Sequence, residues 1–438
     1  MALTHARRGA LAIAATSIAA LTLGGCAAGG APDAGATYDP EENVTLDFAF
    51  WGNDVRADLY AQAIEAFNEE YPNITVNSSF LDFPAFWEKR QTEAAGGGLP
   101  DVMQFDYSYL RQYSENGLLL DLSPYLGGII ETDPLPENVL QIGVVNDETT
   151  AIPTSTNAWG LFTNTKLLAD LGVTPYEGGG SWDDYDKWLS SVTDAAEADG
   201  VEAWGGTDYT VRIQEFELYQ RSNGSDLFDA DGQPTFTEDD LREFWKLGAE
   251  AREEETVIPQ QRWEEATPLS GFDAGLTASE LTWDNFGAGY LGNLGEEYTE
   301  LGLVAPPVTK EGAKDLYLKP SMLHAIAANT EHPEAAATLL DFLVNSPEVG
   351  EIFGTNRGLP ASETQLEGAD LDGLGQQIAD YEASIADRLG DAPPAPIVGY
   401  GSLEQKFLDL GKEIRGGTTT IDDAVDQFFS EMEVVISQ

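Results

Sequence analysis

Aromatic side chains stand close to carboxylate or amide side chains at three places in the first quarter of the chain. They are Trp51 with Asn53, Asp82 with Phe83, and Asp106 with Tyr107. The aromatic rings offer flat apolar faces, and the neighbouring oxygens accept hydrogen bonds. Each of these places follows a short hydrophobic stretch, so the spacing predicts a small-molecule site built on loops.

Residues suited to catalysis or metal binding are few. Of the 3 His, His5 lies in the N-terminal segment, His332 precedes a proline at a helix start, and His324 borders an apolar stretch that favours a core position. A Ser-His-Asp triad and a His/Cys metal site are therefore poorly supported. No phosphate-binding glycine loop is present. We expect no catalytic residue, no metal and no cofactor, and residues 226–232 favour a simple turn over a calcium loop.

The composition is strongly acidic. With 22 Lys+Arg against 76 Asp+Glu, the formal net charge is −54. A nucleic-acid ligand is excluded because its phosphates would be repelled, and a polybasic membrane contact is disfavoured for the same reason. Hydrophobic residues nevertheless make up 42%, and the 9 Trp, 16 Tyr and 19 Phe are enough for a packed core.

The N-terminus is typical of an exported protein. The basic pair Arg7-Arg8 precedes an apolar stretch, Ala10–Leu23, and then Gly24-Gly25-Cys26. Cys26 is the only cysteine, and its setting resembles a bacterial lipobox, which implies diacylation of its thiol and a lipid anchor. We expect residues 1–25 to be a lipoprotein signal peptide and residues 26–43 a flexible tether. Export by either the general or the twin-arginine route stays open.

Alternating apolar periods predict an α/β fold. Strands are expected at 44–51, 74–80, 102–105, 158–164, 278–283, 302–306 and 325–327. Helices are expected at 60–71, 86–95, 182–195, 236–252 and 334–345. The β-α-β-α-β order at the start indicates a parallel sheet, and ligands gather at the carboxyl ends of such strands. The three aromatic and polar pairs lie at those ends.

Four blocks in order resemble one known family. They are Phe67–Val76 followed by Pro100-Asp101-Val102, Ala151–Leu168, Thr174–Tyr185, and Ala325–Ala336. Together they resemble the extracellular solute-binding proteins of family 1, the carbohydrate-binding receptors of ABC transporters, over residues 44 to 360. The chain departs from the family where Thr163 replaces the usual tyrosine before Asn164.

The resemblance implies a two-lobed, periplasmic-binding-protein-like α/β fold with a ligand cleft between the lobes and a hinge. One lobe would hold residues 44–153 plus 301–354, and the other residues 154–300 plus 355–438. It also implies a monomeric, extracytoplasmic, lipid-anchored protein that is no enzyme. This protein would capture a sugar, expected to be an oligosaccharide, and deliver it to the permease subunits of an ABC importer in the cell membrane.

Sugars present C–H faces to aromatic rings and paired hydroxyls to polar side chains. The expected ligand-binding residues are Trp51, Asn53, Asp82, Asp106 and Tyr107 in the first lobe, and Asn157, Trp159, Tyr209, Trp283, Asp284, Arg357 and Tyr400 in the second. Helix capping competes with ligand binding for Asn53 and Asp106, a turn for Asp82, and core packing for the tryptophans. Two other functions stay open: a non-sugar ligand such as a polyamine, and a surface enzyme or adhesin acting on polysaccharide.

Overall fold

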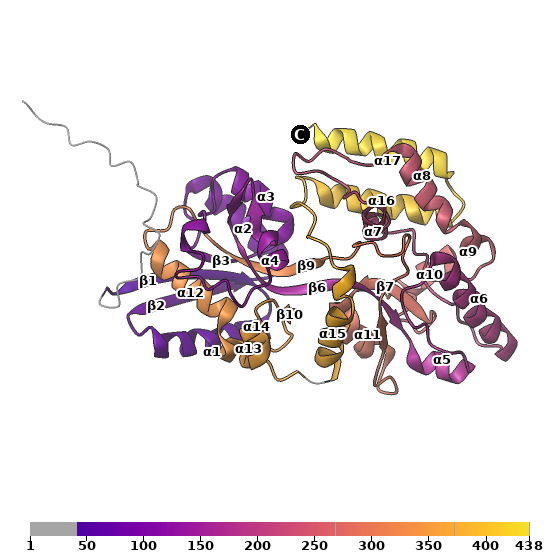
Figure 1. The fold of residues 1–438 in the computed structure, drawn as a ribbon, viewed down its shortest axis with the longest axis horizontal. Helices are drawn as coiled ribbons and strands as arrows, with labels where there is room; N and C mark the ends of the chain where they lie inside the picture. The colour runs from indigo at the N-terminus through magenta and orange to yellow at the C-terminus, as the bar shows by residue number, and fades with distance from the viewer. Residues whose placement is uncertain (1–41, 268, 372, 438) are drawn as a thin grey trace, which may run out of the picture.

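The computed structural model describes residues 42–267, 269–371 and 373–437. The predicted signal peptide, the predicted lipidation site Cys26 and nearly all of the predicted tether lie outside this range. Figure 1 shows two lobes side by side, with strands β6 (Ile152–Thr163) and β9 (Leu318–Ile326) passing between them. The α/β fold class and the two-lobed architecture are therefore as the sequence predicted.

The N-terminal lobe is built on a parallel unit of three strands. It contains β1 (Val44–Trp51), α1 (Asp54–Glu70), β2 (Ile74–Leu81), α2 (Phe83–Gly96), β3 (Val102–Phe105) and α3 (Tyr107–Glu115). Strand β1 pairs in parallel with both β2 and β3, in register from Val44 opposite Ile74 to Trp51 opposite Leu81. Strand β9 then pairs antiparallel with β3. The predicted parallel order is thus confirmed, and the complete sheet is mixed.

Helices cover both faces of this sheet. Helix α4 (Glu137–Leu140) follows before the chain leaves the lobe, and later segments return to supply α12 (Pro333–Asn345), α13 (Pro347–Phe353), the short strand β10 (Leu359–Pro360) and α14 (Glu363–Gly368). In Figure 1, α2 and α3 lie above the strands, and α1, α12 and α13 lie below them. Helix α1 buries Tyr60, Ile64 and Phe67 at helical spacing, so its apolar stripe closes the core.

The C-terminal lobe is mainly helical. It contains α5 (Thr165–Leu171), α6 (Trp182–Asp199), α7 (Ile213–Ser222), α8 (Glu238–Leu247), α9 (Ala249–Glu253), α10 (Gln260–Ala266), β7 (Ser279–Trp283), α11 (Gly287–Leu294), β8 (Gly302–Val304), α15 (Gly373–Ser384), α16 (Tyr400–Arg415) and α17 (Ile421–Ile436). Strands β7 and β8 pair antiparallel with the far half of β6. The predicted helix 236–252 is divided into α8 and α9 at Gly248, where the chain leaves helical geometry.

The chain crosses between the lobes three times. One crossing lies close to the expected boundary, and the other two lie elsewhere. Strand β6 leaves the first core at Ile152 and enters the second at Ala158, close to the crossing expected near Pro153. Leu301 and Leu316 pack in the C-terminal lobe, so the second crossing lies in β9 and not near Leu301. Ala361 packs in the N-terminal core, so the third crossing follows α14 and not Thr355. In both cases the apolar contacts, not the family pattern, fix the boundary.

Two strands at the crossing are longer than predicted. Strand β6 spans 12 residues, all buried, where the sequence indicated 158–164. Strand β9 starts at Leu318, where 325–327 was expected. Both strands lie inside the sheet, and β6 along its whole length and β9 from Met322 to Ile326 are buried, so the alternation expected of a half-exposed strand is lost there.

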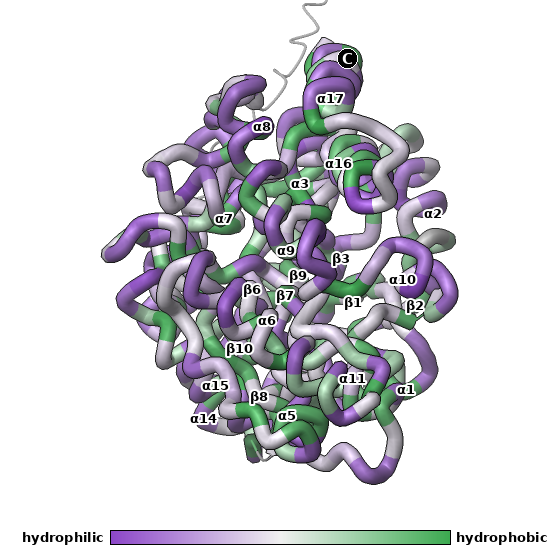
Figure 2. Tube along the Cα trace, turned by 90° about the vertical axis from the view of Figure 1, so that its right-hand side faces the viewer, coloured by the Kyte–Doolittle hydropathy of each residue, from purple (hydrophilic) through white to green (hydrophobic). Residues whose placement is uncertain are grey.

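Hydrophilic residues run along the outer helices, as the purple segments of α8 and α9 in Figure 2 show, and green segments gather toward the interior. Within the described ranges no helix combines the length and apolar character needed to cross a membrane.

Candidate functional site

A cavity of about 120 Å³ lies between the lobes. The N-terminal lobe contributes the start of α3, and the C-terminal lobe contributes α7, β7 and α16. Strand β9 and the chain before α16 complete the wall. The lining residues are Tyr107, Ser108, Gln214, Glu217, Leu227, Phe228, Trp283, Tyr317, Lys319, Pro393, Pro394, Ala395, Pro396, Ile397, Tyr400 and Glu404. Five of these side chains are aromatic, so the wall combines flat apolar faces with a few polar groups.

A proline-rich strap, residues 391–397, closes one side of the cavity. Its middle packs on the N-terminal core through Ala395, whereas Ile397 packs in the C-terminal lobe. Helix α3 holds it by two side chains. The Tyr107 hydroxyl donates to the Pro393 carbonyl at 2.8 Å, and Arg111 Nε donates to the Ala395 carbonyl at 2.9 Å. The strap therefore bridges the two lobes over the cavity.

Two larger hollows lie along the strap, and one of them adjoins the cavity. One, of about 640 Å³, shares Tyr107, Pro393, Pro394 and Ala395 with it. The other, of about 620 Å³, shares Asn138, Asp391 and Ala392 with the first hollow. The space between the lobes therefore extends well beyond the inner cavity on the far side of the strap.

Trp283 at the end of β7 is the largest aromatic side chain in the wall. Its ring meets those of Trp159 and Tyr317 nearly at right angles, with centroids 4.9 Å and 6.0 Å away. Lys319 Nζ lies 5.0 Å from its ring centroid, in a cation–π contact. Lys319 forms no ion pair within 4.0 Å in the described structure. This ammonium is thus held by the ring and is free to donate to a ligand.

Glu217 supplies a carboxylate at the bottom of the cavity. The Tyr317 hydroxyl donates to Glu217 Oε2 at 2.7 Å. Burial raises the pKa of Glu217, and the Tyr317 hydrogen bond and the nearby cations Arg221 and Lys319 oppose that shift. At the rim, Gln214 Nε2 donates to Glu404 Oε1 at 2.7 Å. The cavity therefore offers acceptors and donors beside its aromatic faces.

Three of the twelve predicted ligand-binding residues line this cavity: Tyr107, Trp283 and Tyr400. Each comes from a different element, α3, β7 and α16. Tyr400 stands at the first position of α16, directly after Gly399, whose φ of +85° turns the chain into the helix.

The predicted polar residues of the first lobe cap helices. Asn53 Oδ1 accepts from the Arg56 amide at 3.1 Å, Asp82 Oδ1 from the Ala85 amide at 3.1 Å, and Asp106 Oδ1 from the Ser108 amide at 2.9 Å. None of the three lines the cavity. The competing interpretation as caps is confirmed for Asn53 and Asp106, and the turn expected for Asp82 is a helix cap. Trp51 packs against Phe86 inside the N-terminal lobe.

Three further predicted residues lie behind the cavity wall. Trp159 is 2% exposed and supports Trp283 from the neighbouring strand. Asn157 faces Lys319 across the β6–β9 pair, and its Oδ1 is buried with no hydrogen-bond partner. Asp284 is fully buried, and its Oδ2 accepts from the Ala158 amide at 2.9 Å. These side chains position the wall without lining it.

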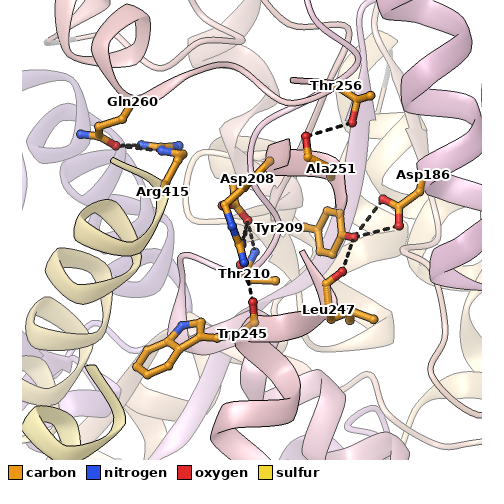
Figure 3. A network of polar contacts seen from close by, with 11 residues as sticks. Asp186, Asp208, Tyr209, Thr210, Trp245, Leu247, Ala251, Thr256, Gln260 and Arg415 are labelled. Atoms are coloured by element: carbon orange, nitrogen blue, oxygen red, sulfur yellow. Dashed lines mark hydrogen bonds and ion pairs between the residues drawn. The ribbon is translucent and has the colours of Figure 1, made fainter. Parts of the chain in front are cut away.

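Tyr209 and Arg357 lie in the lobe cores. Figure 3 shows the Tyr209 hydroxyl beside Asp186, to whose Oδ1 it donates at 2.9 Å, and beside the Leu247 carbonyl. Burial raises the pKa of Asp186 to about 6, although this hydrogen bond opposes the shift. The Arg357 guanidinium stacks 4.0 Å from the Phe353 ring centroid, under the N-terminal sheet. Neither residue lines the cavity.

Sequence reasoning missed the residues of α7, β9 and the strap. Glu217, Tyr317 and Lys319 stand out only once β9 is extended to Leu318, because alternation then directs Tyr317 and Lys319 to the same side. The run Ala392–Pro396 supplies part of the wall and was not predicted to do so. Its Pro-rich composition next to Tyr400 was the available signal.

Within the described ranges, no group of three or more His, Cys, Asp or Glu side chains is arranged to hold a metal ion. At the acidic turn near Asp229, Oδ1 of this residue accepts from the Gln233 amide at 2.8 Å. The predicted turn is therefore confirmed.

Known proteins share this architecture. An extracellular solute-binding protein of family 1 from Alicyclobacillus acidocaldarius matches with a TM-score of 0.76 and 27% identity, over 91% of this chain and 100% of its own. A periplasmic oligogalacturonide-binding protein from Yersinia enterocolitica matches with a TM-score of 0.75 and 21% identity, over 90% and 99%. The GacH receptor of Streptomyces glaucescens matches with a TM-score of 0.65 and 18% identity, over 91% and 100%.

The family model for bacterial extracellular solute-binding proteins matches residues 53–349. The chain therefore belongs to this family, as the ordered sequence blocks indicated. Its members bind solutes and are not enzymes, and the cavity between the lobes lies where the fold brings two binding surfaces together.

Proposed function

We propose that this protein is a lipid-anchored receptor on the outer face of the cell membrane that captures an oligosaccharide and delivers it to an ABC importer. It acts as a monomer. The observation that carries the proposal is the cavity between the lobes, in which Trp283, Tyr107 and Tyr400 stand beside Glu217 and Lys319. A sugar ring needs this combination, because one face is apolar and its edge carries hydroxyl groups.

Three features favour an oligosaccharide over a single sugar. The inner cavity adjoins a larger hollow along the strap, and a second hollow adjoins the first. The Yersinia relative is an oligogalacturonide-binding protein, and the Streptomyces receptor was crystallised with acarbose. A chain of sugar rings could therefore place one ring on Trp283 and extend beneath or beyond the strap.

The competing ligand, a polyamine, meets mixed charge in this cavity. Glu217 and Glu404 would attract it, whereas Lys319, which has no ion-pair partner within 4.0 Å in the described structure, would repel it. A neutral or acidic sugar avoids that repulsion. We therefore place the polyamine second.

Thermal stabilisation by a panel of ligands tests the proposal directly. Any ligand that binds only the folded state raises the melting temperature. Neutral and uronic di- to tetrasaccharides should stabilise the protein, and calorimetry should then give their affinities. Stabilisation by spermidine alone would replace the sugar assignment with the polyamine. Hydrolysis of a chromogenic glycoside would contradict the receptor function.

The lipid anchor is tested separately at Cys26. Cys26→Ser removes the thiol that would be acylated, so the variant should be released into the medium with unchanged ligand affinity. Mass spectrometry of the wild-type N-terminal peptide should show the acyl groups. A wild-type peptide without acyl mass would contradict the anchor while leaving the binding function intact.

A further inference from the structure

Two buried carboxyl groups meet beside the strand that joins the lobes. Asp284, directly after Trp283, is fully buried, and Glu382 on α15 is 9% exposed. Both are attached to β6 by one oxygen. Asp284 Oδ2 accepts from the Ala158 amide at 2.9 Å, and Glu382 Oε2 accepts from the Thr156 hydroxyl at 3.1 Å. The two groups therefore approach each other along one side of β6.

The remaining oxygens of the pair, Asp284 Oδ1 and Glu382 Oε1, are buried without a hydrogen-bond partner, although the Asn285 amide lies close enough to the Asp284 carboxyl group to oppose the rise of its pKa. The two side chains are within hydrogen-bonding reach of each other. Two ionised carboxylates cannot hydrogen-bond to each other, because neither carries a hydrogen. One hydrogen between the two oxygens satisfies both.

Among the described residues, neither carboxyl group of the pair forms an ion pair within 4.0 Å, and no cation opposes the rise of either pKa. The pair contacts β6 through Thr156 and Ala158, with Asp284 in the turn after β7 and Glu382 on α15. The titratable group nearest to both is Tyr381, whose hydroxyl donates to the Trp159 carbonyl at 2.5 Å. Arg388 acts on Tyr381 but is paired with Asp315, at 2.7 Å. A doubly ionised pair would thus be two buried, uncompensated charges.

We propose that Asp284 and Glu382 share one proton in the folded protein and that this protonated pair is a positioning element for Trp283. The pair attaches the residue after Trp283 to β6, the strand that carries Trp159 behind the Trp283 ring. Loss of the proton would drive the two carboxylates apart and move Trp283 relative to β6. The second part of the proposal rests on the proposed function, whereas the shared proton does not.

The electrostatics of the pair agree with this arrangement. Burial raises the pKa of Asp284 to about 7, and burial together with the Asp284 charge raises the pKa of Glu382 well above its usual range. In the unfolded chain both groups ionise at about pH 4. Between that pH and about 7 the folded protein holds two more protons than the unfolded chain, and above about 7 it still holds one more, because the pKa of Glu382 stays well above its usual range. Stability must therefore fall as the pH rises through this window.

The test is the pH dependence of folding in Glu382→Gln. Glutamine keeps the shape and supplies a fixed hydrogen, so folding no longer takes up the proton. Across the window, one such proton changes the folding equilibrium constant by about tenfold per pH unit. Urea denaturation between about pH 5 and 7 should show that this contribution is lost in Glu382→Gln. Asp380→Asn, an exposed carboxyl on the same helix, should keep it.

Asp284→Asn repeats the test from the other side of the pair and covers the case in which Glu382→Gln does not fold. Infrared spectroscopy of the wild type at neutral pH should also show a protonated carboxyl band that either variant weakens. Unchanged pH dependence and an unchanged band in a folded variant would overturn the shared proton.

The positioning role is read from ligand affinity. The wild-type affinity for the best sugar should weaken once the pH rises far enough above 7 to remove the shared proton, and Glu382→Gln should bind with affinity independent of pH over the same range. Parallel pH profiles of affinity would overturn the positioning role. If no sugar binds, the folding and infrared measurements still decide the shared proton, so its failure is distinct from that of the proposed function.

Discussion

Tyr209 and Trp283 show that two aromatic residues in similar sequence settings take different roles. Both aromatic side chains were predicted to contact the ligand. Tyr209 is 1% exposed, stacks on Trp182 at 4.7 Å and donates to Asp186, whereas Trp283 keeps part of its surface in the cavity. The sequence around each residue offers an aromatic beside a carboxylate. Whether the aromatic side chain contacts the ligand or packs in the core depends only on where its strand or loop lies relative to the cavity.

Tyr209→Phe tests this distinction at a single atom. The substitution removes the hydroxyl that donates to Asp186 and leaves the ring in place. Loss of a buried hydrogen bond to a charged group should reduce the free energy of unfolding by about 1–3 kcal/mol. Urea denaturation measures that loss, and calorimetry should find unchanged sugar affinity. Weakened affinity with unchanged stability would place Tyr209 at the ligand instead.

The strap and α3 form the contact between the lobes on the cavity side. Arg111 donates from Nε to the Ala395 carbonyl at 2.9 Å and from Nη1 to the Ala230 carbonyl at 3.0 Å. Ala230 lies in the C-terminal lobe, and Arg111 lies in the N-terminal lobe. Ala395 itself packs on the N-terminal core, so the bond to Ala230 is the one that exists only while the lobes are close, and through it Arg111 should stabilise the closed arrangement.

Arg111→Met keeps the length of the side chain and removes the donors. Hydrogen bonds from a charged donor contribute about 1.5–3 kcal/mol, and losing even one raises the dissociation constant about tenfold or more. Calorimetry measures the affinity, and small-angle scattering should show a more extended ligand-free protein. Arg262→Met, which removes ion pairs to Glu202 and Glu265 within the C-terminal lobe, should change neither quantity. Equal effects of the two variants would contradict the bridging role.

The helices and strands that could be predicted are those whose pattern of apolar residues is evident within the element itself. Strand β1 and helix α12 match their predicted ranges closely, because β1 begins with alternating buried and exposed residues and α12 is an apolar stretch that starts at a proline. Strand β9 was recognised only at its end, since Lys319 and Pro320 interrupt its apolar run. Burial of those residues depends on β6 and the cavity, which are distant in sequence.

At the scale of the whole molecule, two strands and one connection join the lobes. Strands β6 and β9 are hydrogen-bonded to each other along the crossing, with β10 pairing at Ser155 and Thr156. Gly358 packs against them with a φ of +103°, where an added Cβ would lie 2.7 Å from Ser321 Oγ. Motion between the lobes must therefore bend a paired ribbon.

The two-lobed fold could be predicted from the sequence, whereas most of the site could not. The fold follows from ordered blocks and local periods, but the cavity joins residues from α3, α7, β7, β9 and α16. Loop residues such as Asp82 and Asp106 carried the right chemistry and were used to cap helices. Whether such a residue binds a ligand or caps a helix depends on a few ångströms of backbone placement. The spacing of residues along the chain does not determine that placement.

The most direct test of the central claim, a sugar site at the interlobe cavity, is a calorimetric titration of the wild type and Trp283→Ala with the most stabilising oligosaccharide. Stacking on an aromatic ring contributes about 1–3 kcal/mol, so the dissociation constant should rise about 5- to 150-fold. Trp263→Ala is the matched control, because its ring also carries a lysine, Lys412 at 5.2 Å, but lies outside the cavity. Near-native affinity in Trp283→Ala, with the protein folded, would contradict the site.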